Sequence, residues 1–217
     1  MKPRALLVAW LLFFSGVAGA AAPPGAMTRD QALRFLGDEV AEVRRAAAAS
    51  LAEVGRAADA KALIARLRDA DGEVREAAHM AIWSVWSRSG DANVDQMLAA
   101  GTVAMNGGDF DRALALFSQV IKRKPAFAEG WNKRATLYFF AGRLKESLAD
   151  CDQVMKFNPD HFGALAGYGQ IWLQLGDFGK SLEYFERALA INPTMEGVVA
   201  NIENIRRAQA RERGRGV

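Results

Sequence analysis

Two amphipathic helices are predicted within residues 126–159 from the spacing of their apolar positions. Apolar side chains recur at three- and four-residue intervals up to Tyr138, and the pattern resumes at Leu144 after a break at Gly142. Glycine just past the first helix tolerates a positive φ, and Pro159 cannot extend the second helix. The segment is therefore expected to form a helix–turn–helix unit.

The same pattern recurs on both sides of this unit at a spacing of 34 residues. The closing prolines are Pro125, Pro159 and Pro193, and the turn glycines are Gly108, Gly142 and Gly176. A third set of positions holds only small residues, namely Gly101, Ala135 and Gly169. A larger side chain in this third set is expected to destabilise the helix pair, because it would keep the two helices apart.

This period and layout resemble the tetratricopeptide repeat. The resemblance implies an all-α fold, a right-handed α-solenoid whose units stack to bury the apolar faces that one hairpin leaves exposed. We expect three units, a capping helix and a disordered tail, which cover residues 92–125, 126–159, 160–193, 194–213 and 214–217 in that order.

A second self-similarity, with a step of 31 residues, precedes these units. The block EVRRAA at residues 42–47 recurs as EVREAA at residues 73–78. These blocks resemble the short HEAT-like repeats first named after phycobilin lyases, which implies two such repeats over residues 28–90. The resemblance also implies a structural role, tying neighbouring helices together, for Asp38, Asp69, Arg44 and Arg75.

Trp83 and Trp86 lie near the end of the last HEAT-like helix. Only residues 87–92 separate that helix from the first tetratricopeptide helix, so we expect a rigid junction in which both indoles pack against the next hairpin. The alternative is that the two indoles form an exposed docking patch.

Residues 1–20 have the pattern of a secretory signal peptide. Lys2 and Arg4 precede an apolar run, and a small-x-small cleavage pattern ends at Ala20. A short Pro/Gly linker, residues 21–27, follows. The pattern predicts export, to the periplasm of a bacterial cell. The alternative is an uncleaved N-terminal helix that anchors the chain in the membrane.

The charge balance does not indicate a positively charged surface that would bind nucleic acid. The chain has 28 Lys and Arg against 25 Asp and Glu, and loss of Lys2 and Arg4 with the leader leaves it nearly neutral. Five arginines within residues 206–215 are expected to belong to a solvated terminus, with phosphate binding as the alternative. Contact with a membrane is expected only if the N-terminal helix is uncleaved.

The resemblance to tetratricopeptide repeats implies that the first helices of successive units line a concave groove. Apolar positions there can receive side chains of a bound peptide, and Asn132 and Gln170 can bind its backbone. The alternative for Phe139 and Phe140 is packing between hairpins. The groove positions of the family fall on Leu98, Thr102, Met105, Asn132, Thr136, Phe139, Phe140, Gln170, Leu173 and Gln174, with further ones on Asp95, Asn106, Glu129, Gly163 and Ala166.

The chain departs from the carboxylate clamp with which members of this family grip a C-terminal aspartate. Leu98 and Thr102 stand where the clamp has a lysine and an asparagine, and Gly163 and Gly167 stand where the third repeat supplies two cations. Without convergent positive charge, nothing offsets the desolvation of a carboxylate. A role in holding chaperone tails is therefore not expected.

No catalytic or metal-binding pattern is found, and no cofactor is expected. His79 and His161 have no obvious catalytic company, and Cys151 replaces Phe117 and Phe185 of the sister repeats, which predicts a buried, inert thiol. We predict a non-enzymatic scaffold or adaptor of the cell envelope that binds a segment of another protein. The alternatives are a structural or assembly subunit that docks through the HEAT-like or convex face and, more remotely, an enzyme.

Overall fold

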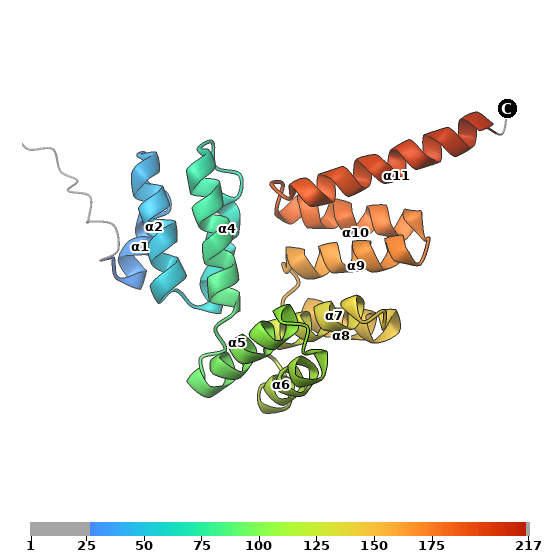
Figure 1. Ribbon diagram of the computed structural model, residues 1–217. Helices are drawn as coiled ribbons and strands as arrows, with labels where there is room; N and C mark the ends of the chain where they lie inside the picture. Colours follow the sequence, from blue (N-terminus) through green and yellow to red (C-terminus); the bar gives the residue numbers. More distant parts are fainter. Residues whose placement is uncertain (1–26, 216–217) are drawn as a thin grey trace, which may run out of the picture.

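A computed structural model describes residues 27–215, and every regular element in this range is a helix (Figure 1). The prediction of an all-α fold is thus confirmed. The predicted leader and almost all of the predicted linker lie outside the described residues. Within residues 27–215, no helix combines the length and the apolar character that crossing a membrane requires.

The first arm of the molecule is built from the 31-residue repeats. Its helices are α1 Arg29–Phe35, α2 Ala41–Val54, the 3₁₀ turn η1 Ala57–Asp59, α3 Ala60–Arg66 and α4 Gly72–Trp86. α1 packs against α2, while α2 and α3 pack against α4. The side chains of Thr28 and Asp71 cap α1 and α4, so both helices begin where the sequence supplies an acceptor for free backbone N–H groups.

The rest of the described chain forms three helix pairs and a final single helix. Their bounds are α5 Ala92–Asn106, α6 Phe110–Arg123, α7 Ala128–Phe140, α8 Leu144–Phe157, α9 Phe162–Gln174, α10 Phe178–Ile191 and α11 Glu196–Arg215. Each pair lies within one of the predicted 34-residue units. α11 continues to Arg215, beyond the end at residue 213 that the sequence pattern predicted for the capping helix.

The turn within each pair depends on a glycine with left-handed backbone geometry. Gly108, Gly142 and Gly176 have φ angles of 79°, 70° and 79°. Residues with a Cβ adopt such angles only at a cost, so the recurring glycine is a conformational requirement, as predicted. In the outer pairs, Asp109 and Asp177 then cap α6 and α10.

The 31-residue repeats are tied together by Arg44 and Asp69, as the resemblance to HEAT-like repeats implied. Arg44 of α2 donates through Nε and Nη2 to the Asp69 carboxylate, at 2.8 and 2.6 Å, and through Nη1 to the backbone oxygen of Asp38. One repeat later, Arg75 makes the matching contact with the backbone oxygen of Asp69. The hydrogen bonds from Arg44 lower the pKa of Asp69 against the opposing effect of burial.

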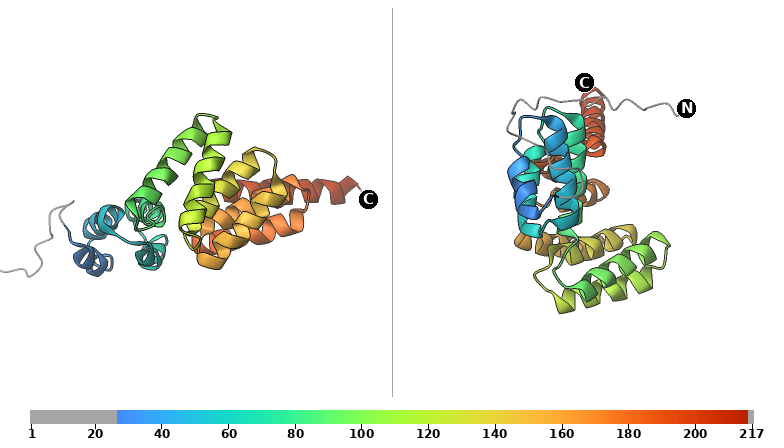
Figure 2. Two further views of the ribbon diagram at one scale, coloured as in Figure 1. Left: turned by 90° about the horizontal axis from the view of Figure 1, so that it is seen from below. Right: turned by 90° about the vertical axis from the view of Figure 1, so that its left-hand side faces the viewer.

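The first arm rests on the start of α9, so α1–α4 and α9–α11 form two arms joined by α5–α8 (Figures 1 and 2). Trp86 stacks on His161 with ring centroids 4.4 Å apart, and Trp83 meets Phe162 edge-on at 5.4 Å. Among the described residues, the core cluster that contains Trp86 has no member from α5 or α6. The prediction that both tryptophans pack against the next hairpin is wrong, because the curvature of the array returns α9 to α4.

Arg68 makes a second contact between the two arms. It follows α3 and donates to the backbone oxygens of Ala190 and Ile191 at the C-terminal end of α10. A cation is favourable there because the last carbonyl groups of a helix carry partial negative charge. The side chains of Ile191 and Met195 pack against the core of the first arm nearby. The arms are thus joined by aromatic packing and by a helix cap.

Candidate binding cleft

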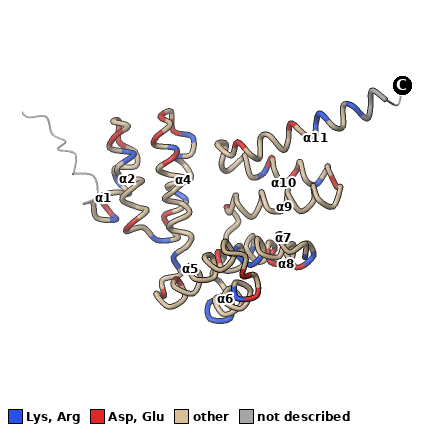
Figure 3. The backbone as a smooth tube through the Cα atoms, in the orientation of Figure 1, with Lys and Arg blue, Asp and Glu red and all other residues tan. Residues whose placement is uncertain are grey.

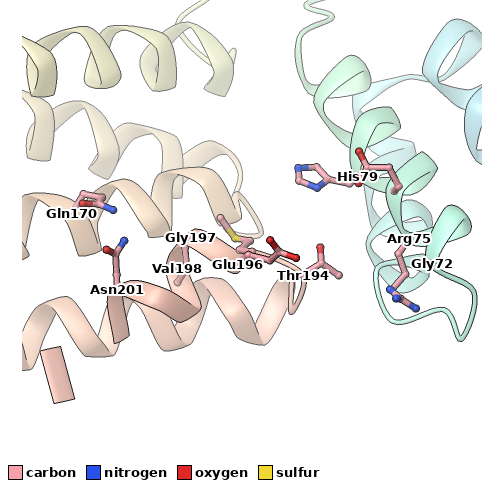
Figure 4. Close-up of a pocket in the computed structure, with 11 residues that line it drawn as sticks. Gly72, Arg75, His79, Gln170, Thr194, Glu196, Gly197, Val198 and Asn201 are labelled. Atoms are coloured by element: carbon pink, nitrogen blue, oxygen red, sulfur yellow. The ribbon is translucent and has the colours of Figure 1, made fainter. Parts of the chain in front are cut away.

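A cleft of about 710 Å³ lies between α4 on one side and α9 with the start of α11 on the other (Figure 4). His79 projects from α4, and Gln170 and Asn201 belong to the opposite wall. The lining residues are Gly72, Arg75, Glu76, His79, Gln170, Thr194, Met195, Glu196, Gly197, Val198 and Asn201. This volume falls within the range of ligand-binding clefts, which makes the cleft the candidate site.

One face of α4 forms the first wall of the cleft. Gly72, Arg75, Glu76 and His79 recur every three or four residues, which places them on one side of the helix. The other side of α4 is apolar and packs against α2 and α3. α4 is therefore a core helix of the first arm and a wall of the cleft at the same time, and sequence reasoning did not identify it as a site element.

The cleft contains charges of both signs. Arg75 is held in place because its Nη1 donates to the backbone oxygens of Asp69 and Ala70, at 2.8 and 3.0 Å. Glu76 and Glu196 are exposed on opposite walls. Acidic and basic positions are interspersed along α4 (Figure 3). The described lining residues thus provide no convergent positive charge that could hold a carboxylate.

A smaller cavity of about 110 Å³ lies between α7 and α9. Four of the predicted groove residues line it, namely Asn132, Thr136, Phe139 and Gln170. Gln170 also lines the larger cleft. The cavity between α7 and α9 and the larger cleft therefore adjoin each other at Gln170.

Four of the ten predicted groove residues are engaged inside the protein. Leu98 is buried in the core cluster of α5 and α6, and Asn132 is buried with its amide donating to Glu129 at 3.1 Å. The hydroxyls of Thr102 and Thr136 each donate to the backbone oxygen four residues earlier, at 2.9 Å. These groups have limited freedom to bind a partner.

The other predicted groove residues are more accessible. Met105, Phe139 and Leu173 are partly buried, each with one side against the core, and Gln174 is exposed. Phe140 is 62% exposed although it is a large aromatic residue. The accessible part of the predicted groove thus lies at the C-terminal ends of α5, α7 and α9.

The groove position predicted at Glu129 is wrong, because this side chain is fully buried against His161. The Nδ1 atom of His161 accepts the backbone N–H of Ala164 at 3.0 Å, so the ring proton is on Nε2 and is donated to Glu129, also at 3.0 Å. Lys133 adds an ion pair at 3.3 Å without hydrogen-bond alignment. Burial alone would raise the pKa of Glu129, but the hydrogen bond from His161 and the charge of Lys133 hold it below its usual value.

The sequence analysis identified no interaction partner for His161, so it missed the hydrogen bond with Glu129. One signal was available, since His161 occupies the repeat position that Phe127 occupies one unit earlier. A polar residue at a position that is apolar in a sister repeat requires a buried partner. The side chains of both residues are inaccessible to solvent, so the pair is part of the packed interior that joins α7 to the start of α9.

Comparison with known protein families bears on both types of repeat. A family model described as tetratricopeptide repeat matches residues 98–160, and a second model of the same description matches residues 162–195. A model described as HEAT repeats matches residues 17–83. The chain contains tetratricopeptide and HEAT repeats. The resemblance to tetratricopeptide repeats is thereby confirmed, and the second resemblance is confirmed as one to HEAT repeats.

Relatives of the chain share its tetratricopeptide repeats. A TPR repeat-containing protein of Rhizobium etli is 35% identical over 108 residues, which cover 50% of this chain and 53% of that protein. The Hsp70-Hsp90 organizing protein of Triticum aestivum is 28% identical over 116 residues, which cover 54% of this chain and 20% of that protein. The chain thus spans about half the length of the first relative and a fifth of the second.

Two solved structures resemble the chain in fold. The first TPR of Spaghetti (RPAP3), bound to the HSP90 peptide SRMEEVD, has a TM-score of 0.52 at 19% identity and covers 55% of this chain and 96% of that chain. The crystal structure of MamA has a TM-score of 0.51 at 17% identity and covers 62% of this chain and 78% of that chain. At these identities the likeness concerns the fold alone.

In the third tetratricopeptide repeat, a tryptophan of the HEAT arm occupies the space beside Gly163. A Cβ atom at position 163 would lie 2.5 Å from Cη2 of Trp83, a separation that real side chains do not tolerate. Gly163 is one of the two positions where the carboxylate clamp of the family has a cation. The clamp is therefore excluded at this position by packing as well as by the residue type.

Cys151 of the second tetratricopeptide repeat is buried, as predicted. Burial, together with the nearby Asp150 and Asp152, raises the pKa of its thiol to about 12, so the thiol stays protonated at neutral pH. Within residues 27–215, no group of His, Cys, Asp and Glu side chains is arranged to hold a metal ion.

Proposed function

We propose that the protein is a non-enzymatic adaptor that binds a segment of a partner protein along the concave surface. The segment runs from the ends of α7 and α9, with Phe140 and Gln174, into the cleft walled by α4 and α11. The observation that carries the proposal is the cleft of about 710 Å³, which adjoins the cavity between α7 and α9 at Gln170.

The relatives support a peptide-binding role. The RPAP3 domain was solved with an HSP90 peptide, and the wheat relative is named for organizing Hsp70 and Hsp90. Peptide binding in a groove between helices is a recurring use of such surfaces. The adaptor role of this chain is inferred from its own cleft and from these relatives together.

The chemistry of the surface favours a segment from within a chain over a charged C-terminal tail. Gln170 and Asn201 carry amides that both donate and accept hydrogen bonds, which suits a peptide backbone. Trp83 closes the clamp position at Gly163, and Arg75 is engaged with backbone oxygens of its own arm. A terminal carboxylate would therefore lose its hydration without gaining a cation.

The test is capture of partners from an envelope extract by the wild-type protein and by single variants. Phe140→Glu places a charge on an exposed residue of α7, and Asn201→Glu places one on a residue of α11 that lines the cleft, so the fold should be kept while binding of the segment is lost. Phe140 is preferred to Phe139 because Phe139 packs against the core. Val40→Glu, on an exposed residue at the start of α2, is the matched control.

We expect a partner that is retained by wild type and by Val40→Glu and is lost from both groove variants. Cross-links between that partner and α7, α9 or α4 would complete the assignment. A partner that all variants retain, cross-linked to α2 or to the convex side, would contradict the groove and support the alternative of an assembly subunit.

We propose further that the protein acts in the cell envelope after export. Support comes from the sequence pattern of residues 1–20, which lie outside the described residues. The intact mass of the protein purified from the periplasm should correspond to cleavage after Ala20. A protein found uncleaved in the membrane fraction would favour the anchored alternative, and one found uncleaved in the cytosol would refute export.

A further inference from the structure

The array of 34-residue repeats has an edge that nothing in the described chain covers. This open edge is the outer side of α5 and α6, defined by Gln96, Ala100, Val103, Leu116 and Arg123. Three of these residues lie on α5 at spacings of three and four and therefore share one face of the helix. Figure 2 shows α5 and α6 at the outer end of the array. A shallow cavity of about 520 Å³ runs along this edge.

Equivalent positions in the next two repeats show what this surface is built to contact. Val103 is 73% exposed, whereas Leu137 and Ile171, at the same position one and two repeats later, are 2% and 1% exposed. Gly130 corresponds to Gln96, and a Cβ atom at Gly130 would lie 2.7 Å from Cγ1 of Val120 on α6. In repeats two and three, this face therefore packs against the second helix of the preceding repeat.

The covered edges also receive polar contacts from the helix that covers them. Arg134, at the position of Ala100, donates to the hydroxyl of Ser118 on α6 at 3.2 Å. Tyr168, two repeats along from Ala100, donates to the carboxylate of Asp152 on α8. The covering helix thus supplies apolar packing and oxygen acceptors, among them a carboxylate.

The HEAT arm does not supply such a helix to the first repeat. Gly90, with a φ of 77°, lies between α4 and α5, and Trp83 and Trp86 of α4 pack against the start of α9 instead. At the other end of the array, α11 covers the last repeat with Val198 and Ile202. One end of the tetratricopeptide array is thus closed by a helix of the chain, while the other is open.

The charges on the open edge indicate what covers it. Arg123 lines the cavity, and Arg112 lies one helical turn before Leu116 on the same face of α6. Both arginines are exposed, and neither forms an ion pair with any residue that the structure describes. The same edge of a second copy would bring further arginines to this surface. An acidic partner is therefore favoured over a second copy.

We propose that the open edge of α5 and α6 is a second protein-binding surface, which takes an amphipathic helix whose apolar seam is flanked by acidic residues. The apolar seam packs on Val103, Ala100 and Leu116, as α6 and α8 pack on the later repeats. The acidic flanks pair with Arg112 and Arg123. This surface is separate from the cleft and does not depend on the function proposed for it.

The test uses two synthetic helical peptides of about 18 residues, long enough to form helix on binding. Both carry leucines at three- and four-residue intervals, with acetylated and amidated ends; one has glutamates on the flanks and the other has lysines. Fluorescence anisotropy with the full-length protein should show the glutamate peptide binding at least about tenfold more tightly than the lysine peptide. Val103→Glu should abolish this binding, whereas Val40→Glu should preserve it.

A double variant, Arg112→Glu with Arg123→Glu, should reverse the preference between the two peptides. Equal binding of the two peptides to the wild type, or equal binding of the glutamate peptide to wild type and Val103→Glu, would overturn the proposal. Loss of binding in Phe140→Glu but not in Val103→Glu would assign the peptide to the groove and also overturn it. Self-association of the wild type that Val103→Glu removes, seen by sedimentation, would assign the edge to a second copy instead.

Discussion

Three pairs of residues, each sixteen positions apart, set the distance between the two helices of each tetratricopeptide repeat. Gly101 faces Phe117 and Gly169 faces Phe185, whereas in the middle repeat Ala135 shares a core cluster with Cys151. A Cβ atom at Gly101 would lie 2.6 Å from the Phe117 ring. A small residue on the first helix of a repeat thus leaves room for a large aromatic ring on the second helix, and the less bulky Cys151 is paired with the larger Ala135. The structure agrees with the prediction that positions 101, 135 and 169 need a small residue. The pairing of a smaller residue on one helix with a larger one on the other could also be seen by aligning the three repeats.

Gly169→Ala should destabilise the protein by about 1–3 kcal/mol, because the added methyl group overlaps the Phe185 ring. Gly167→Ala is the matched control two residues earlier on the same helix, since its Cβ would make ordinary contact with Sγ of Cys151 at 3.9 Å. That control should be neutral or slightly stabilising, because alanine favours helix. Urea denaturation measures both. Similar losses in the two variants would contradict the size argument, and Phe185→Leu should partly rescue Gly169→Ala.

The buried Glu129 predicts a specific acid response. Its pKa is lower in the folded protein than the usual 4.5, so folding favours the ionised carboxylate. This stabilisation is complete above pH 4.5 or so and is lost as the pH falls through the folded-state pKa. Glu129→Gln keeps an acceptor for His161 but removes the charge that Lys133 faces.

The variant Glu129→Gln should therefore be less stable than wild type at pH 7, and the difference should shrink below about pH 4.5. Free energies of unfolding from urea titrations between pH 3 and pH 7 provide the measurement. Asp59 and Asp69, whose pKa values are also lowered, keep an acid response in both proteins, so only the difference between the curves is informative. Two parallel curves would refute the role of Glu129.

At the scale of elements, HEAT and tetratricopeptide units are joined to their neighbours by different forces. The HEAT repeats use the nearly buried Arg44 and Asp69 pair, in which the carboxylate also accepts the backbone N–H of Asp71 at 3.1 Å. The tetratricopeptide repeats rely on apolar faces and on isolated polar pairs, such as Tyr168 of α9 with Asp152 of α8. The sequence motif led to the first pair through family resemblance, whereas the second required knowledge of which helices face each other.

Asp69→Ala should cost about 2–3 kcal/mol, because it leaves Arg44 without its carboxylate and Asp71 without its acceptor. Glu73→Ala is the matched control, since its ion pair with Arg45 is exposed and should contribute at most about 1 kcal/mol. Thermal or urea unfolding of the two variants gives the comparison. The interpretation of Asp69 as a structural tie would be wrong if the two substitutions had equal effects.

At the scale of the whole molecule, contact between the arms determines where the cleft lies. Trp86 and His161 are 75 positions apart in the chain, yet their rings stack. This contact holds α4 opposite α9 and α11 and so creates the wall that carries Arg75 and His79. It also leaves the outer edge of α5 uncovered. The cleft and the open edge therefore both result from the packing of α4 against the start of α9.

Trp86→Ala should destabilise the protein by about 3–5 kcal/mol and loosen the contact between the arms. Deuterium exchange should increase in α3 and in the first turns of α9, where Trp86 packs. Trp131→Ala, which removes a half-buried indole from α7, should increase exchange locally and leave α3 unchanged. If α3 and α9 exchanged as in wild type in the Trp86 variant, the contact would not hold the arms together.

The accessible groove was only partly predictable from the sequence. Thr136, Phe139 and Gln170, which the family positions assigned to one groove, line one cavity, because the position of a residue within a repeat determines its face on the helix. The position within the repeat did not predict that Leu98 and Asn132 would be buried. Exposure depends on how closely neighbouring helices approach, and that distance follows from all the side chains between them.

Sequence alone determined the local structure of this protein. The 31- and 34-residue periods, the left-handed glycines and the Arg44 and Asp69 motif specify helices, turns and contacts between adjacent units, because these depend on residues within one or two repeats. Only the tertiary structure decided that the HEAT arm meets the third tetratricopeptide repeat. That contact follows from the rotation accumulated over several units, and a small change in each unit adds up to a large displacement at the end of the array.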